Sequence, residues 1–164
     1  MNILIVEDCP TQLEFLRINA ELAFPTSSII GALSIEEGLN IAQTLTTKDI
    51  VLLDLVFDNS SPEETLSVFS DVMKKLPVII VTGVEDKDYA ELAKAAGANN
   101  YLEKPITQET MRVHILQAIQ AEAIKVVSEI TNKTITKIED DLIKSDDLKA
   151  LEVKVAPIWN HEIQ

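Results

Sequence analysis

The stretch Ile50-Val51-Leu52-Leu53-Asp54 decides how this chain of 164 residues is organised. Four consecutive apolar residues favour a strand that is buried on both faces, as the strands of parallel sheets are. The run ends on an acid. The stretch Ile3-Leu4-Ile5-Val6 has the same form and ends on Glu7-Asp8, and Pro77-Val78-Ile79-Ile80-Val81 ends on Thr82-Gly83. The sequence therefore predicts three buried strands, each followed by polar residues.

Helical patterns alternate with these strands as far as about residue 120. Apolar residues at helical spacing predict helices over 10–24, 34–45, 61–73 and 86–96 and from residue 107 onward, and two further strands are expected over 28–32 and 100–102. Ser34 and Glu37 have the spacing of a capping box, and Ser61-Pro62 suits the start of a helix. Five strands alternating with helices predict an α/β fold with a doubly wound parallel sheet.

Residues 121–164 are expected to form a C-terminal extension, mostly helical, beyond a first domain of residues 1–120. The last helix of the first domain should continue to Ile130. Thr131-Asn132-Lys133-Thr134 has low helix propensity and is expected to break it. Helical spacing resumes over 135–142, and a last short helix is expected over 145–151. The extension is too short for an independent domain, so it either packs on the first domain or pairs with another copy.

The composition excludes several classes of protein. Aspartate and glutamate number 27 against 14 lysines and arginines, a formal charge of −13, which argues against nucleic-acid binding. A single cysteine, Cys9, excludes an internal disulfide and a cysteine-rich zinc site. The apolar runs are far shorter than the ~20 residues of a membrane helix. The N-terminus lacks the basic segment of a signal peptide, so the expected location is the cytoplasm.

Polar residues follow the strands in a pattern that suggests chemistry. Glu7 and Asp8 follow the first strand, Asp54 the third, Thr82 the fourth and Lys104 the fifth. Ligands of open parallel sheets bind at the carboxyl ends of the strands, where these residues should meet. Each residue alone would be an ordinary loop residue or helix cap. Together, the carboxylates would repel one another, which favours a cation shared between them. Hard oxygen ligands suit Mg²⁺, an ion that also binds phosphate oxygens.

Four stretches in order resemble one family, the receiver domain of two-component response regulators. They are residues 3–10, 50–54, 77–83 and 95–106, the last reading Ala95-Ala96-Gly97-Ala98-Asn99-Asn100-Tyr101-Leu102-Glu103-Lys104-Pro105-Ile106. The resemblance covers about residues 1–120. It implies a five-stranded, flavodoxin-like sheet of the receiver type.

The resemblance also implies a role for each acid. Asp54 matches the phosphoacceptor, whose carboxylate attacks a phosphohistidine to give an aspartyl phosphate. Asp8 and Glu7 match the acidic pair that places Mg²⁺, Asp8 as a direct ligand and Glu7 through water. The backbone carbonyl of Val56 matches a further ligand. The implied cofactor is Mg²⁺, and the implied donor is a histidine kinase or a histidine phosphotransfer protein.

Three more residues match the response of this family to phosphorylation. Lys104 matches the lysine that contacts the phosphoryl group, and its bond to Pro105 is often cis in the family. Thr82 matches the switch hydroxyl, and Tyr101 matches the aromatic side chain whose rotamer follows it. The implied signalling surface comprises the helix over 86–96, the next strand and the last helix. A homodimer through this surface or through the extension is a further expectation.

Two features depart from the family pattern or modify it. Asp58 and Pro62 stand where the family usually has a proline and a glycine, so the loop after Asp54 is expected to be unusual. Val56 and Val84 occupy the two positions that tune the lifetime of the phosphoryl group in this family. Neither valine can hold an attacking water by a hydrogen bond, which predicts self-dephosphorylation over hours, an order-of-magnitude expectation.

The sequence thus predicts a Mg²⁺-dependent receiver that accepts a phosphoryl group on Asp54 and signals by protein–protein contact. Its chemistry would be a single turnover of self-phosphorylation followed by slow self-dephosphorylation. Two alternatives remain open. One is a structural or dimerisation module that keeps the fold without phosphorylation. The other is the N-terminal receiver fragment of a larger hybrid kinase or regulator, for which His161-Glu162-Ile163 offers a slight resemblance to a kinase histidine motif.

Overall fold

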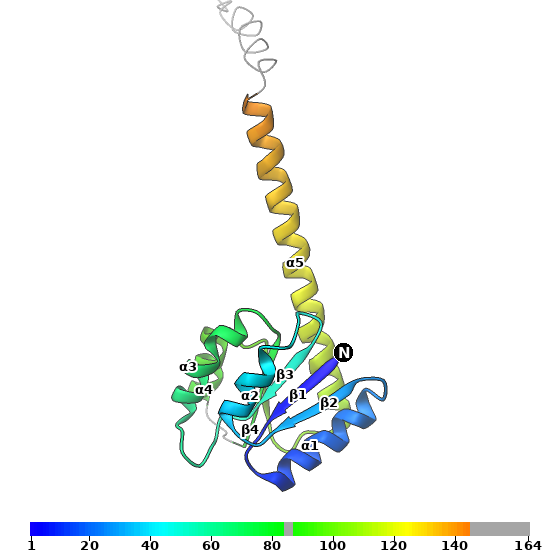
Figure 1. The fold of residues 1–164 in the computed structure, drawn as a ribbon, viewed down its shortest axis with the longest axis vertical. Helices are drawn as coiled ribbons and strands as arrows, with labels where there is room; N and C mark the ends of the chain where they lie inside the picture. The colour runs from blue at the N-terminus through cyan, green and yellow to red at the C-terminus, as the bar shows by residue number, and fades with distance from the viewer. Residues whose placement is uncertain (84–86, 145–164) are drawn as a thin grey trace, which may run out of the picture. The chain divides into compact units, whose positions relative to one another are not determined.

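The computed structural model describes residues 1–83 and 87–144, and its centre is a five-stranded sheet (Figure 1). The strand order is β2-β1-β3-β4-β5, and every neighbouring pair is parallel. This order confirms the predicted doubly wound α/β fold. The strands are β1 Asn2–Val6, β2 Ser28–Ala32, β3 Ile50–Leu53, β4 Val78–Thr82 and β5 Asn100–Glu103.

Helices cover both faces of the sheet, which explains why the central strands are continuous apolar runs. The helices are α1 Pro10–Ala23, α2 Ile35–Ala42, α3 Pro62–Met73, α4 Lys87–Ala96 and α5 Gln108–Lys144. Residues of α1 and of the first turns of α5 pack with Ile3 and Ile5 of β1. Residues of α2, α3 and α4 pack with Leu4 and Val6. Alternate residues of one strand therefore enter opposite cores, and all four are fully buried.

Local residues determine where two of these helices begin. Ser61 accepts a hydrogen bond from the Glu64 backbone N–H, and the Glu64 side chain accepts one from the Ser61 N–H, which completes a capping box at the start of α3. Ser34 caps α2 by accepting from the Glu37 N–H, as predicted. The Glu37 carboxylate instead accepts from the Leu33 N–H, so the second half of that box is shifted by one residue.

Gly97 follows the last residue of α4 and turns the chain at the end of that helix. Its φ of 104° lies in the left-handed region that favours glycine. Its N–H donates to the Lys94 carbonyl at 3.0 Å, and the next N–H, of Ala98, donates to the Ala93 carbonyl at the same distance. These bonds satisfy carbonyls at the helix end and turn the chain into β5.

The predicted break at residues 131–134 is wrong, because α5 is one helix of 37 residues. The hydroxyls of Thr131 and Thr134 donate to the carbonyls of Val127 and Ile130, one turn earlier, at 2.8 and 2.9 Å. Threonine lowers helix stability by less than about 1 kcal/mol relative to alanine, and a hydroxyl bonded within the helix needs no other partner. A low local propensity is therefore not sufficient to end this helix.

The chain divides into two compact units, Met1–Ala123 and Ile124–Gln164. The short helix expected over 145–151 lies outside the described residues. Among the residues that the structure describes, no helix is both long and apolar enough to cross a membrane.

A buried acid, Asp49, ties the start of β1 to the loop before β3. Its carboxylate accepts hydrogen bonds from the Asn2 N–H at 2.7 Å and from the N–H and hydroxyl of Thr46 at 2.9 and 3.0 Å. Burial alone would raise the pKa of this carboxyl, but these donors favour the charged form and hold the pKa below its ordinary value of 3.8. Asp49 therefore stabilises the fold above about pH 4 in its ionised form.

We expect Asp49→Asn to lower the free energy of unfolding by about 2 kcal/mol at pH 7, because its amide group faces N–H donors. The stabilisation by the carboxylate starts to fall below its ordinary pKa of 3.8 and is lost as pH falls through the depressed pKa of the folded state, so the stabilities of the two proteins should begin to converge below about pH 3.8. Urea unfolding followed by circular dichroism measures both effects. The exposed Asp71→Asn is the control and should leave the midpoint nearly unchanged. An equal loss at pH 7 and at pH 3 would contradict this account.

Candidate functional site

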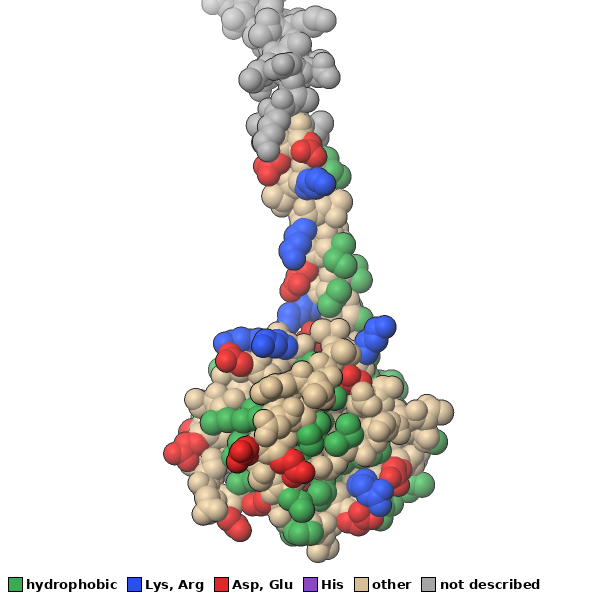
Figure 2. Space-filling model, in the orientation of Figure 1, with side chains coloured by type: hydrophobic (Ala, Val, Ile, Leu, Met, Phe, Trp, Pro, Cys, Tyr) green, Lys and Arg blue, Asp and Glu red, His purple; other side chains and the backbone are tan. Residues whose placement is uncertain are grey.

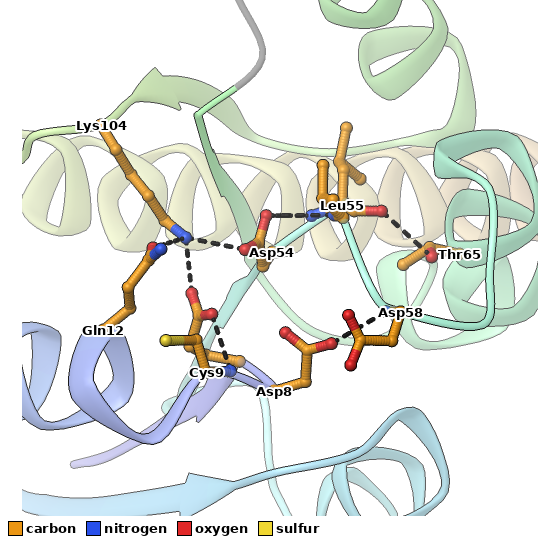
Figure 3. A network of polar contacts seen from close by, with 10 residues as sticks. Asp8, Cys9, Gln12, Asp54, Leu55, Asp58, Thr65 and Lys104 are labelled. Atoms are coloured by element: carbon orange, nitrogen blue, oxygen red, sulfur yellow. Dashed lines mark hydrogen bonds and ion pairs between the residues drawn. The ribbon is translucent and has the colours of Figure 1, made fainter.

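Asp54 stands directly after β3, and its carboxylate is held on both oxygens. Oδ1 accepts hydrogen bonds from the backbone N–H groups of Leu55 and Val56 at 2.6 and 3.2 Å. Oδ2 accepts from the Lys104 ammonium at 2.7 Å (Figure 3). The Asp54 backbone N–H donates to the Val6 carbonyl at the end of β1, which fixes the position of the residue beside that strand. The side chain is buried, so these donors replace the water that an exposed carboxylate would contact.

Lys104 joins the ends of three strands through its ammonium group. It follows β5, and its Nζ lies 2.7 Å from Asp54 Oδ2 and 2.5 Å from Glu7 Oε2 at the end of β1. Gln12, in the first turn of α1, accepts from the same nitrogen at 2.6 Å (Figure 3). An ammonium group has three N–H donors, and here each has an oxygen acceptor.

Burial and neighbouring charges move the pKa values of this cluster. Glu7 is almost fully buried, and this burial raises its pKa against the opposing effect of the Lys104 ammonium. Burial alone would lower the pKa of Lys104. The hydrogen bonds and negative charges of Asp54 and Glu7 outweigh it and raise the pKa above the ordinary value of 10.5. The lysine therefore stays charged at neutral pH and partly neutralises the two buried acids.

A cavity of about 800 Å³ opens beside this cluster. Glu7, Asp8, Asp54 and Asp58 line it together with Val56 and Lys104. Asp8 Oδ2 accepts a hydrogen bond from the Asp58 backbone N–H at 3.0 Å, which joins the loop after β1 to the loop after β3 (Figure 3). The acids that follow the two strands therefore meet in one cavity.

The donors around this cavity fit Mg²⁺. Among the described residues, no three histidine, cysteine or acidic side chains are grouped so that they could hold a metal by themselves. Mg²⁺ does not require three such side chains, because it keeps several water ligands and binds to the protein through one or two carboxylates and other oxygens. Asp8, Asp54 and the Val56 carbonyl are hard oxygen donors of this kind, and the first two line the cavity along with the Val56 residue.

The loop after Asp54, which departs from the family pattern, has a defined conformation. Phe57 and Ser60 form an isolated bridge, with the Ser60 N–H donating to the Phe57 carbonyl. The buried Thr65 of α3 donates to the Leu55 carbonyl at 3.4 Å and lies 3.3 Å from the Ser60 hydroxyl oxygen. These contacts anchor the loop to α3 without the usual proline and glycine.

Thr82 and Tyr101, the expected switch residues, belong to neighbouring strands. Thr82 is fully buried at the end of β4, where its backbone carbonyl accepts from the Lys104 N–H at 2.8 Å. Gly83, the next residue, lines the cavity. Tyr101 on β5 is half-buried and packs against the core under α2, α3 and α4. The Lys104–Pro105 peptide bond is cis, and Val84 lies outside the described residues.

Gln12 and Thr65 are the site residues that the sequence analysis missed. Gln12 is in the first turn of a helix that begins just after Asp8, and such a turn necessarily lies at the carboxyl edge of the sheet. That position was the only sequence-level indication of its contact with Lys104. Thr65 could not be found, because its role depends on the path of the irregular loop before α3.

This chain has a doubly wound sheet, with acids and a bridging lysine at the carboxyl edge. These features are typical of α/β proteins that bind ligands at this edge. Residues 3–117 match the family described as response regulator receiver domain, and the chain belongs to this family. The expected roles of its individual residues remain predictions.

Known proteins of similar sequence or structure agree with this assignment. Protein PilH of Pseudomonas aeruginosa is 32% identical over 111 residues, which are 66% of this chain and 89% of that protein. A response regulator receiver domain protein from Clostridium thermocellum is 30% identical, with a TM-score of 0.66 over 75% of this chain and 97% of the other. A CheY-like receiver from Methanospirillum hungatei, 22% identical, shares the fold with a TM-score of 0.66 over 76% and 97% of the two chains.

We expect Lys104→Met to lower the free energy of unfolding by about 3 kcal/mol at pH 7, because it leaves two buried acids without a counter-charge. The loss should be smaller at pH 5, since Glu7, whose pKa is already raised, can then take up a proton. Urea unfolding at both pH values measures the effect, with Lys94→Met, at an exposed position of α4, as the control. Equal stability of the two variants at pH 7 would refute the bridging role.

Proposed function

We propose that this chain is a phosphoryl-accepting receiver, in which Asp54 takes a phosphoryl group from a phosphohistidine in a Mg²⁺-dependent reaction. The donor would be a histidine kinase or a histidine phosphotransfer protein in the cytoplasm. The observation that carries the proposal is the setting of the Asp54 carboxylate. It lies between two backbone N–H groups and the Lys104 ammonium and lines the acidic cavity.

The chemistry needs only positioning and charge neutralisation. A carboxylate oxygen of Asp54 forms a bond to phosphorus, the bond from phosphorus to the imidazole nitrogen breaks, and its electron pair stays on that nitrogen. Asp8, Asp54 and the Val56 carbonyl would hold Mg²⁺, with Glu7 acting through water, and the ion would supply charge neutralisation for the transferring group. Lys104, already 2.7 Å from Asp54, provides a fixed cation for the phosphoryl oxygens.

Phosphorylation would be transmitted by the strand next to Asp54. The aspartyl phosphate adds negative charge and acceptor oxygens, for which the Thr82 hydroxyl and Lys104 are the proposed partners. A shift of Thr82 would change the space available to Tyr101 on the neighbouring strand. The surface of α4, β5 and α5 would then present the signal to a downstream protein.

Incubation of the chain with acetyl phosphate and Mg²⁺ should add about 80 Da to its intact mass, the mass of one phosphoryl group. The addition should disappear in Asp54→Asn and when the metal is chelated. Asp58→Asn is the matched control, because Asp58 lines the same cavity but is not the proposed acceptor. Protein that stays unmodified, with its fold intact by circular dichroism, would favour the alternative of a structural module without phosphorylation.

The phosphorylated protein should lose its phosphoryl group over hours, an order-of-magnitude expectation. Val56 is half exposed beside Asp54, and its side chain cannot position an attacking water. We expect Val56→Asn to shorten the half-life by about 10-fold or more, because an amide can orient that water. Intact mass after removal of the donor gives the decay, with Val68→Asn, at an exposed position of α3, as the control. A half-life of seconds in the unmodified sequence would contradict the prediction.

A further inference from the structure

The part of α5 after Ala123 carries large apolar side chains that are exposed among the residues the structure describes. Ile124 and Val127 are each 63% exposed, and Ile135 and Ile138 are 48% and 53% exposed. Isolated exposed apolar residues are common on protein surfaces, but a continuous group of them marks a surface that another molecule covers. The spacing of these four residues shows that they form such a group.

These apolar residues recur every eleven positions. Eleven residues separate Ile124 from Ile135, Val127 from Ile138 and Thr131 from Leu142, so the pattern advances by three, four and four residues. The same spacing continues backward in the sequence to Val113, Leu116 and Gln120. A helix of 3.6 residues per turn places positions spaced in this way within a sector of about 100°. We call Ile124, Val127, Thr131, Ile135 and Ile138 the apolar stripe.

Most charged side chains of this part of the helix lie away from the apolar stripe, and Glu139 and Asp141 flank it on its two sides. Figure 2 shows apolar side chains along one side of this part of α5 and lysine and acidic side chains along the other. Helical spacing places Val126 on the charged side and Ile130 between the apolar stripe and the charged side. In a chain with a net charge of −13, this separation leaves an uncharged strip along the helix on which two copies can approach one another. The charged residues opposite are Lys125, Glu129, Lys133, Lys137 and Asp140.

We propose that the apolar stripe binds the apolar stripe of a second copy of this chain in a two-stranded coiled coil. An eleven-residue repeat corresponds to 3.67 residues per turn, so identical helices can keep the stripe in contact over several turns with a slight right-handed supercoil. The part of α5 that carries the stripe, residues 124–144, spans about 30 Å. This inference goes beyond the proposed phosphorylation and does not depend on it.

Thr131 lies at the centre of the apolar stripe and determines the register of the two helices. It is the one polar residue of the stripe, and its hydroxyl donates to the Val127 carbonyl of its own helix at 2.8 Å. Its polar group therefore has a partner, and its methyl group is available for packing. Parallel, in-register helices place Thr131 against Thr131 and every apolar layer against its equal. An antiparallel pair over the same stripe would also place Thr131 against Thr131, because the spacing of the stripe is symmetric about this residue, and it would place Ile124 opposite Ile138 and Val127 opposite Ile135.

The first test compares the same substitution at adjacent positions. Val127→Glu puts a charge in the stripe, whereas Val126→Glu puts one on the charged face, and glutamate favours the helix in both. Sedimentation equilibrium of the full chain should give a dimer, with the dissociation constant raised about 100-fold or more by Val127→Glu because a carboxylate would be buried without a partner. Val126→Glu should change it less than about 3-fold. Circular dichroism verifies that both variants keep their helix content.

A second test examines the register directly. In a Cys9→Ser background, Thr131→Cys should form an intermolecular disulfide rapidly on mild oxidation, and Val126→Cys should not, because only the first brings the two sulfur atoms together. A monomeric unmodified chain would overturn the proposal. So would a dimer that survives Val127→Glu, or one that cross-links through a mixture of Thr131→Cys and Ile135→Cys chains but not through Thr131→Cys alone.

Discussion

The contact of the Lys104 ammonium with both Glu7 and Asp54 is the interaction on which the rest of the site depends. Two carboxylates from neighbouring strands are buried within reach of one nitrogen, and without that cation they would repel one another in a medium that screens poorly. The fold makes this arrangement unavoidable, because β1, β3 and β5 are parallel and all end at the same edge. The topology of the sheet therefore determines which charged side chains meet at the site.

The sheet and the location of the site could be predicted from the sequence because both follow from simple patterns. Runs such as Ile50–Leu53 are apolar at every position, which only a strand buried on both faces requires, and the structure buries all four residues. The polar residue after each run then had to lie at the carboxyl edge. The meeting of Asp54, Glu7 and Lys104 needed no more information than strand direction and the order of residues.

Other features could not be predicted because they depend on geometry that no local pattern records. Thr131 and Thr134 were expected to break α5, yet their hydroxyls bond to carbonyls of the same helix, so the propensity of each residue alone was misleading. Glu37 bonds to the N–H of Leu33 rather than to that of Ser34. The contact of Gln12 with Lys104 depends on how α1 turns away from β1, which is a property of the folded chain.

The filled hydrogen-bonding capacity of Lys104 has a consequence for any oxygen that enters the cavity. Its ammonium can donate only three hydrogen bonds, and the described structure gives all three to Glu7, Asp54 and Gln12. A ligand oxygen can therefore accept a hydrogen bond from Lys104 only if one of these three acceptors gives up its own. Gln12 is the uncharged member of the three, so its release changes the electrostatic energy least. The Gln12 side chain thus occupies the position that a ligand oxygen would take, and Glu7 and Asp54 keep Lys104 as their counterion when Gln12 leaves.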